Sequence, residues 1–128
     1  MNLLLDTHVA LWAITDSPRL AAKARELIAE PANTVWVSVA SLWEITIKHS
    51  LGRGDMPISG AQAKAWFEQS GYRLLTIDAA HVLGVADLPA LHNDPFDRLL
   101  VAQALAEPLR LITHDAQVAR YSDTVIAI

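Results

Sequence analysis

The chain opens with Asn2-Leu3-Leu4-Leu5-Asp6-Thr7-His8, a short apolar run that ends in a single acid. We predict a buried strand over 2–6 and a helix over 7–14, since the apolar side chains of the second segment recur at helical spacing. A similar unit returns near the C-terminus, where the apolar run 110–113 is followed closely by Asp115. Strands that alternate with helices in this way favour an α/β domain built on a mostly parallel sheet.

The segments between these two units continue the alternation. Further strands are predicted at 34–37, 72–76 and 124–128. Helices are predicted at 18–28, 39–52, 59–70, 79–86 and 95–105, with a last short helix from Ala116. The chain has no internal repeat and no linker, so 1–128 is expected to form a single domain.

Composition narrows the class of protein. Of the 128 residues, 52% are hydrophobic and 19% are charged, so the chain is long enough to bury a core and should fold compactly. It has no cysteine, which excludes disulfides and thiolate metal sites and makes a cytoplasmic location the default expectation. No basic leader is visible, and no apolar run approaches the ~20 residues of a membrane helix, so no membrane association is expected.

Four acids stand where the predicted fold would gather them. Asp6 and Asp115 follow strands, Asp97 lies in the first turn of a helix, and Glu44 interrupts an apolar helix. Parallel α/β sheets bind ligands beyond the carboxyl ends of their strands. Four carboxylates brought together there would repel one another, and a divalent cation would compensate that repulsion. The pattern therefore predicts a metal-dependent hydrolase.

Each acid taken alone also has a structural explanation. Asp6 and Asp115 can cap the helices that follow them, and Asp94 is favoured as the cap of the next helix, because it precedes a proline. Asp97 would then occupy the third helical position, where a carboxylate stabilises the helix dipole. The prediction of a site rests on the combination of acids and not on any one of them.

Glu44 is the hardest of the four to explain as a structural residue. It lies between Trp43 and Ile45 in a segment that should be largely buried, and a buried carboxylate needs a partner. Lys48, four residues further on, can form a helix ion pair with it. A metal ion would satisfy the carboxylate better.

The charge of the chain limits how it can bind a polyanion. The net charge is -4; once the four predicted site acids are set aside, the other ten acids balance the ten lysines and arginines. Tight binding of nucleic acid by charge alone is therefore not expected, and any such binding would depend on metal and on local basic residues.

Signals for other chemistries are absent or weak. The chain has no phosphate-binding loop, no dinucleotide fingerprint and no Gly-x-Ser-x-Gly elbow. Its five histidines show no metal-ligand spacing; His8 and His114 adjoin predicted site acids, and a packing or surface role is favoured over substrate contact. The four tryptophans are expected in the core or at an interface.

Four motifs carry a family resemblance that spans nearly the whole chain. They occupy residues 3–8, 37–45, 92–104 and 111–115. In this order and over this length they resemble the PIN-domain family, and within it the VapC-type toxins of bacterial toxin–antitoxin pairs. The resemblance implies a Rossmann-like three-layer α/β/α sandwich and a ribonuclease that depends on Mg²⁺ or Mn²⁺.

The resemblance also implies roles for particular residues. Catalysis and metal binding fall to Asp6, Glu44, Asp97 and Asp115. Supporting roles fall to Thr113, at a position that often orients the site, and less strongly to Asp94 and Arg98. The resemblance further implies an RNA substrate, a homodimer and a cognate antitoxin that binds over or near the site.

The resulting hypothesis is hydrolysis of RNA by water, leaving a 5′-phosphate and a 3′-hydroxyl. Lys48, Arg53 or Arg98 could contact phosphates, although a solvated surface charge is the favoured role for each. The alternative is a non-catalytic, receiver-like signalling domain with a Mg²⁺-binding acidic pocket. Such a domain needs a second acid after the first strand and a late lysine, whereas Asp6 stands alone and no lysine follows Lys64.

Overall fold

Five short strands form one parallel sheet at the centre of the molecule. In the computed structural model, which describes residues 1–128, they are β1 (Asn2–Leu5), β2 (Thr34–Ser38), β3 (Arg73–Leu75), β4 (Arg110–Thr113) and β5 (Ile126–Ala127). Their spatial order is β3-β2-β1-β4-β5, and every neighbouring pair is parallel. The order of the strands therefore reverses between β1 and β4, which is where open α/β sheets place their ligand sites.

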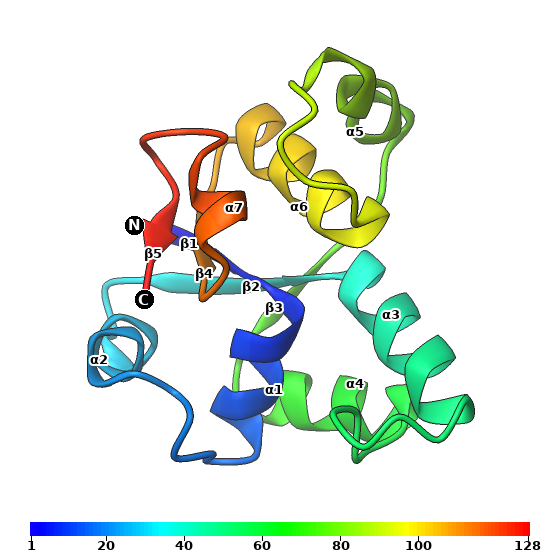
Figure 1. Ribbon diagram of the computed structural model, residues 1–128. Coiled ribbons are helices and arrows are strands. Elements are labelled where there is room, and N and C mark those ends of the chain that lie inside the picture. Colours follow the sequence, from blue (N-terminus) through cyan, green and yellow to red (C-terminus); the bar gives the residue numbers. More distant parts are fainter.

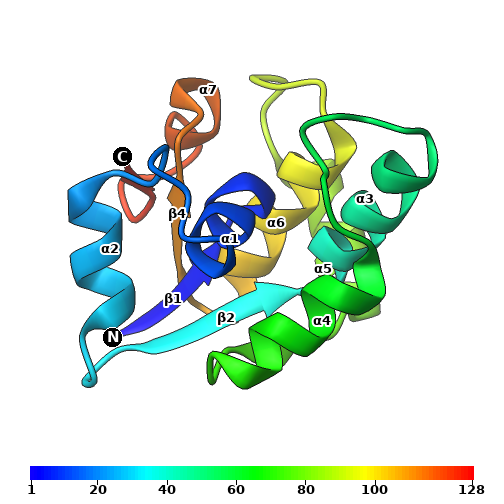
Figure 2. The ribbon, with the colours of Figure 1, turned by 90° about the horizontal axis from the view of Figure 1, so that it is seen from below.

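Helices cover both faces of the sheet, as predicted (Figure 1). One layer holds α1 (Thr7–Ile14), α2 (Ala22–Ala29) and α4 (Gly60–Gln69), and Figure 2 views the molecule from this side. The other layer holds α5 (Ala79–Gly84), α6 (Pro95–Ala106) and α7 (Ala116–Ala119), with a 3-10 turn at Val85–Asp87. Between them, α3 (Val39–Ser50) continues from β2 and contacts α1, α4 and α6.

The leucines of β1 explain why this strand is central. Leu3 and Leu5 face the core beneath α1, α2 and α4, whereas Leu4 faces the second core beneath α6, and all three are 0% exposed. Successive side chains of a strand point to opposite faces, so a continuous apolar run suits a strand that is covered on both sides. Burying each leucine contributes about 2 kcal/mol. The residue that follows, Asp6, is thereby attached to the central, fully covered strand of the sheet.

The second helix begins later than predicted. Residues 17–20 form a turn in which the amide of Leu20 donates to the carbonyl of Ser17, and Asp16 before it has a φ of 50°. This turn holds Pro18 outside the helix, which starts at Ala22 instead. Sequence alone placed the proline in the first helical turn because it also suits that position.

Other differences are small. The strand predicted at 124–128 is limited to β5, because only Ile126 and Ala127 pair with β4, and the helix predicted at 79–86 gives way to the 3-10 turn after Gly84. Trp43 and Trp66 are 56% and 38% exposed, so of the two expected locations, the core or an interface, the core is excluded for them. No helix combines the length and the apolar character that crossing a membrane requires.

Candidate active site

A polar cavity of about 230 Å³ opens at the carboxyl ends of β1 and β4. No hydrophobic residue lines it. Its walls are formed by Asp6, Thr7, His8, Glu44, Lys48, His92, Asp94, Asp97, His114 and Asp115. The fold thus brings all four predicted site acids to one space, although they come from four elements that are far apart in the sequence.

Asp6 both caps α1 and faces the cavity. Its Oδ1 accepts a hydrogen bond from the amide of Val9 (2.9 Å), and its Oδ2 accepts one from the hydroxyl of Thr113 (2.5 Å). The same hydroxyl oxygen accepts from the amide of Asp115 (3.0 Å). The cap explanation and the site explanation for Asp6 are therefore compatible, and Thr113 has the contacts that its expected orienting role requires.

Glu44 is held at both carboxylate oxygens and is 4% exposed. Its Oε2 lies 2.5 Å from Nζ of Lys48, and its Oε1 accepts from the hydroxyl of Thr7 (2.6 Å). The side chain of Lys48 is only 19% exposed. The favoured role of Lys48 as a solvated charge is therefore wrong, because this ammonium forms part of the cavity wall and neutralises one of its acids.

The start of α6 presents two acids with different tasks. Asp94 is the helix cap, since its Oδ1 accepts from the amides of Phe96 (2.8 Å) and Asp97 (3.1 Å). Asp97 points its carboxylate into the cavity, where Nε2 of His92 lies 3.4 Å from its Oδ2. No backbone amide or hydroxyl of the protein donates to that carboxylate. Asp97 is therefore the site acid with the fewest protein partners.

Arg98 does not line the cavity. Its Nη2 donates to the carbonyls of Val85 (3.2 Å) and Leu88 (3.3 Å), and its side chain is partly buried, so the favoured role of a solvated charge is wrong here as well. It fastens the loop before α6 to the helix. Arg53 does keep a surface position, beside Asp55.

The cavity carries more negative charge than the protein compensates. Burial raises the pKa of Asp97 to about 7, and the neighbouring charges of Asp94, Asp6 and Glu44 raise it as well, against an opposing effect of His92. The raised pKa reflects burial first and, in addition, repulsion from the neighbouring acids. A set of oxygen ligands under such repulsion fits a hard divalent cation such as Mg²⁺ or Mn²⁺.

His92 contacts two of the site acids, and sequence analysis assigned it no role. Its Nε2 lies 2.9 Å from Oδ2 of Asp115 and 3.4 Å from Oδ2 of Asp97. Burial opposes ionisation of Asp115, but the hydrogen bond from His92 and those from the α7 backbone outweigh it, so the pKa of Asp115 is below its ordinary value. The signals in the sequence were its place two residues before the Asp94 cap and its position at the start of the 92–104 motif.

Two more histidines stand at the rim. His114 Nδ1 lies 3.5 Å from Oδ2 of Asp6, and this hydrogen bond raises the pKa of His114 against the effect of burial. His8 Nε2 lies 3.2 Å from Asp55 on the loop after α3. Trp12 packs against both imidazole rings. The expected packing role of His8 and His114 is thus present, beside the contact of His114 with a site acid.

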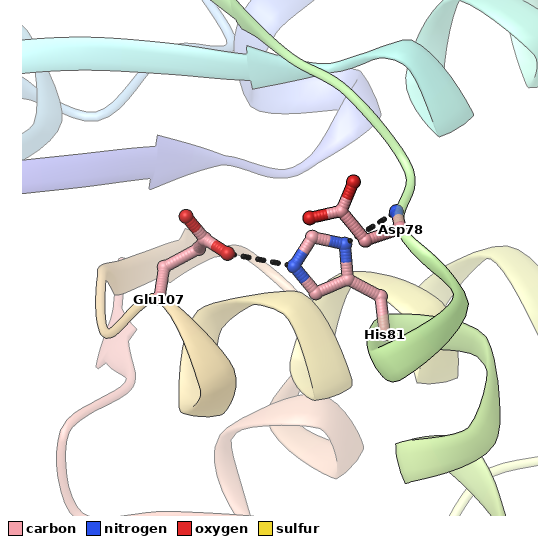
Figure 3. A group of neighbouring side chains, drawn as sticks. All are labelled: Asp78, His81 and Glu107. Atoms are coloured by element: carbon pink, nitrogen blue, oxygen red, sulfur yellow. Dashed lines mark hydrogen bonds and ion pairs between the residues drawn. The ribbon is translucent and has the colours of Figure 1, made fainter.

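A second group of histidine and carboxylates lies outside this cavity (Figure 3). The amide of Asp78 donates to Nδ1 of His81 (3.0 Å), and Nε2 of His81 lies 2.7 Å from Oε2 of Glu107. The ring of His81 is 2% exposed. This group joins the start of α5 to the end of α6.

Nearly the whole chain matches one family: the model of the PIN domain covers residues 3–123. The chain belongs to the PIN-domain family. This confirms the resemblance based on the four motifs. A similar member is Ribonuclease VapC22 of Mycobacterium tuberculosis (strain ATCC 25618 / H37Rv), 29% identical over 117 residues that cover 89% of this chain and 87% of that protein.

Solved structures share the fold of this PIN domain along its full length. VapBC2 from Rickettsia felis, bound to a DNA fragment from its promoter, matches with a TM-score of 0.70 and 21% identity over 100% of this chain and 98% of the other. FitAcB from Neisseria gonorrhoeae matches with a TM-score of 0.68 and 19% identity over 98% of this chain and 96% of the other. At these identities the likeness establishes the fold alone.

Proposed function

We propose that this PIN domain is a metal-dependent endoribonuclease and the toxin of a toxin–antitoxin pair. The observation that carries the proposal is the meeting of Asp6, Glu44, Asp97 and Asp115 in one polar cavity. The similarity to Ribonuclease VapC22 supports RNA as the substrate. The alternative of a receiver-like signalling domain is disfavoured, because the PIN-domain family matches residues 3–123.

The four carboxylates are the residues that would hold Mg²⁺ or Mn²⁺. When bound, such an ion activates water for attack on a phosphodiester and neutralises charge that builds up on the phosphate. The protein's own side chains prepare the ligands: Thr113 and Val9 hold Asp6, while Thr7 and Lys48 hold Glu44. Carboxylates oriented in this way lose less freedom when they bind a cation.

The proposed partners are RNA, a cognate antitoxin and a second copy of the chain. Solved relatives named VapBC support the antitoxin. Exposed and partly exposed apolar side chains between α3, α5 and α6 support a protein partner, because such patches on soluble domains commonly mark interfaces. They line a hollow of about 300 Å³ formed by Trp43, Val82, Val85, Pro95, Phe96 and Leu99.

A cleavage assay tests the proposed activity. The wild-type chain should cut single-stranded RNA with Mg²⁺ and stop when EDTA is added. Asp97→Asn should lower the rate by about a thousandfold, since it removes a carboxylate from the cation site. The matched control is Asp78→Asn, which changes an exposed helix cap outside the cavity and should keep the wild-type rate. Cleavage that persists in EDTA and in Asp97→Asn would overturn the proposal.

A further inference from the structure

His92 connects the segment that follows α7 to the start of α6. Its amide donates to the hydroxyl of Tyr121 (2.9 Å), just after α7, and its Nδ1 accepts from the amide of Asp94 (2.9 Å), at the cap of α6. The ring between these two attachments is 14% exposed. The imidazole is therefore held in one orientation, with Nε2 directed at Asp115 and Asp97.

The bond to Asp94 also fixes which ring nitrogen carries the proton. Since Nδ1 accepts a hydrogen bond from an amide, it presents a lone pair, and the proton of the imidazole resides on Nε2. An N–H at Nε2 donates to a carboxylate and has no lone pair left to bind a metal ion. His92 therefore acts on the acids and is not itself a ligand.

Asp115 depends on this donor for one of its two carboxylate oxygens. Its Oδ1 accepts the capping bond from the amide of Gln117 (2.8 Å), which leaves Oδ2 to be oriented by His92 at 2.9 Å. Its side chain is 32% exposed, far more than the 6% of Asp6. Without the imidazole, water would replace it as the hydrogen-bond donor to Oδ2. The carboxylate could then rotate, because only the hydrogen bond from Gln117 would still hold it.

We propose that His92 is a positioning residue that holds Asp115 and Asp97 in the arrangement in which they bind the divalent cation. The inference rests on the proposed metal site and names a residue that this site requires. Donors that orient metal-binding carboxylates typically change metal affinity by about 10–100-fold when they are removed.

Direct titration with Mn²⁺ by calorimetry tests the inference on the full chain. His92→Ala should weaken Mn²⁺ binding by about 10–100-fold. His92→Gln should recover part of that loss, because its side-chain amide can place an N–H near the position of Nε2. Tyr121→Phe removes only the anchor of the His92 backbone and should stay within about threefold of wild type. Thermal unfolding in EDTA checks that each variant is folded.

The outcomes separate this inference from the proposed function. If Asp97→Asn loses Mn²⁺ binding and His92→Ala keeps it, His92 has no positioning role while the metal site stands. Tighter binding by His92→Ala would overturn the inference too, because it would mean that the imidazole competes with the ion. Equal losses in Tyr121→Phe and His92→Ala would assign the effect to the loop and not to the ring. Unchanged binding by Asp97→Asn would overturn the metal site itself.

Discussion

Two histidines of this PIN domain have the same hydrogen bonds and different surroundings. In both His81 and His92, Nδ1 accepts from a backbone amide near a helix start and Nε2 reaches a carboxylate. Both groups also bring their candidate ligand atoms within 4.8 Å of one another. Distance alone would therefore rank them as equal metal sites.

What separates them is the charge and space around the carboxylates. His81 donates to Glu107 alone, and this pair joins two helices through a buried imidazole and a partly exposed carboxylate (Figure 3). His92 faces carboxylates that share a polar cavity with Glu44 and Asp6. A cluster of potential ligands becomes a cation site when several oxygens point into one space and their charge is not compensated. This difference can be tested through stability, metal affinity and the pH dependence of unfolding.

The largest expected effect is on stability and belongs to His81. His81→Ala should lower the free energy of unfolding by about 3 kcal/mol, because it leaves a void and removes partners from buried polar groups. His92→Ala should lower it by about 1 kcal/mol or less, since its ring borders a water-accessible cavity. Urea unfolding in EDTA measures both variants. Equal losses would contradict the assignment of His81 to structure and His92 to the site.

The second prediction concerns the two carboxylates that accept from these histidines. Asp115→Asn should weaken Mn²⁺ binding by at least about tenfold, or about 1.4 kcal/mol, because it removes a charged ligand. Glu107→Gln makes the same chemical change in the other group and should leave Mn²⁺ affinity unchanged. Calorimetric titration with Mn²⁺ measures the affinity of both variants. A similar loss of affinity in Asp115→Asn and Glu107→Gln would show that the cavity is not the binding site.

The smallest expected effect is the dependence of stability on pH in EDTA. A carboxyl group whose pKa rises from 3.8 unfolded to about 7 folded binds more protons when folded, so its contribution to stability is present below pH 4 and lost as pH rises through about 7. Since Asp97 is partly solvent-screened, we expect a loss on the order of 1 kcal/mol. Asp97→Asn should flatten this part of the curve. Parallel curves for wild type and variant, from thermal melts at pH 4 to 8, would contradict the repulsion inferred in the cavity.

Much of the fold was predictable because its signals are local. The apolar run of β1 and the helical spacing of 7–14 lie within a few residues of each other, and each element buries the face that its pattern indicates. The gathering of Asp6 and Asp115 was also predictable, because parallel strands end at one edge of a sheet. The start of α2 was missed, because Pro18 suits a turn as well as a first helical position.

The ion pair of Lys48 with Glu44 was predictable from their spacing, but the burial of Lys48 and the contacts of His92 and Arg98 were not. Whether a lysine is solvated depends on which wall of the cavity its helix forms, and Lys48 proved to be mostly buried. Arg98 bonds to carbonyls of a loop whose path no pattern specifies. The role of His92 depends on which ring nitrogen carries the proton, and the backbone amide of Asp94 determines this. Such contacts join residues from different helices, strands and loops, so they can be identified only from the folded structure.

The hydrogen bond between Thr113 and Asp6 determines how early during synthesis of the chain the site can form. It joins residues 107 positions apart, and β1 pairs directly with β4. A chain still being synthesised exposes Asp6 early but lacks the strand and the acid that complete the cavity. The nascent protein therefore cannot assemble this cavity before β4 and Asp115 have left the ribosome and joined β1.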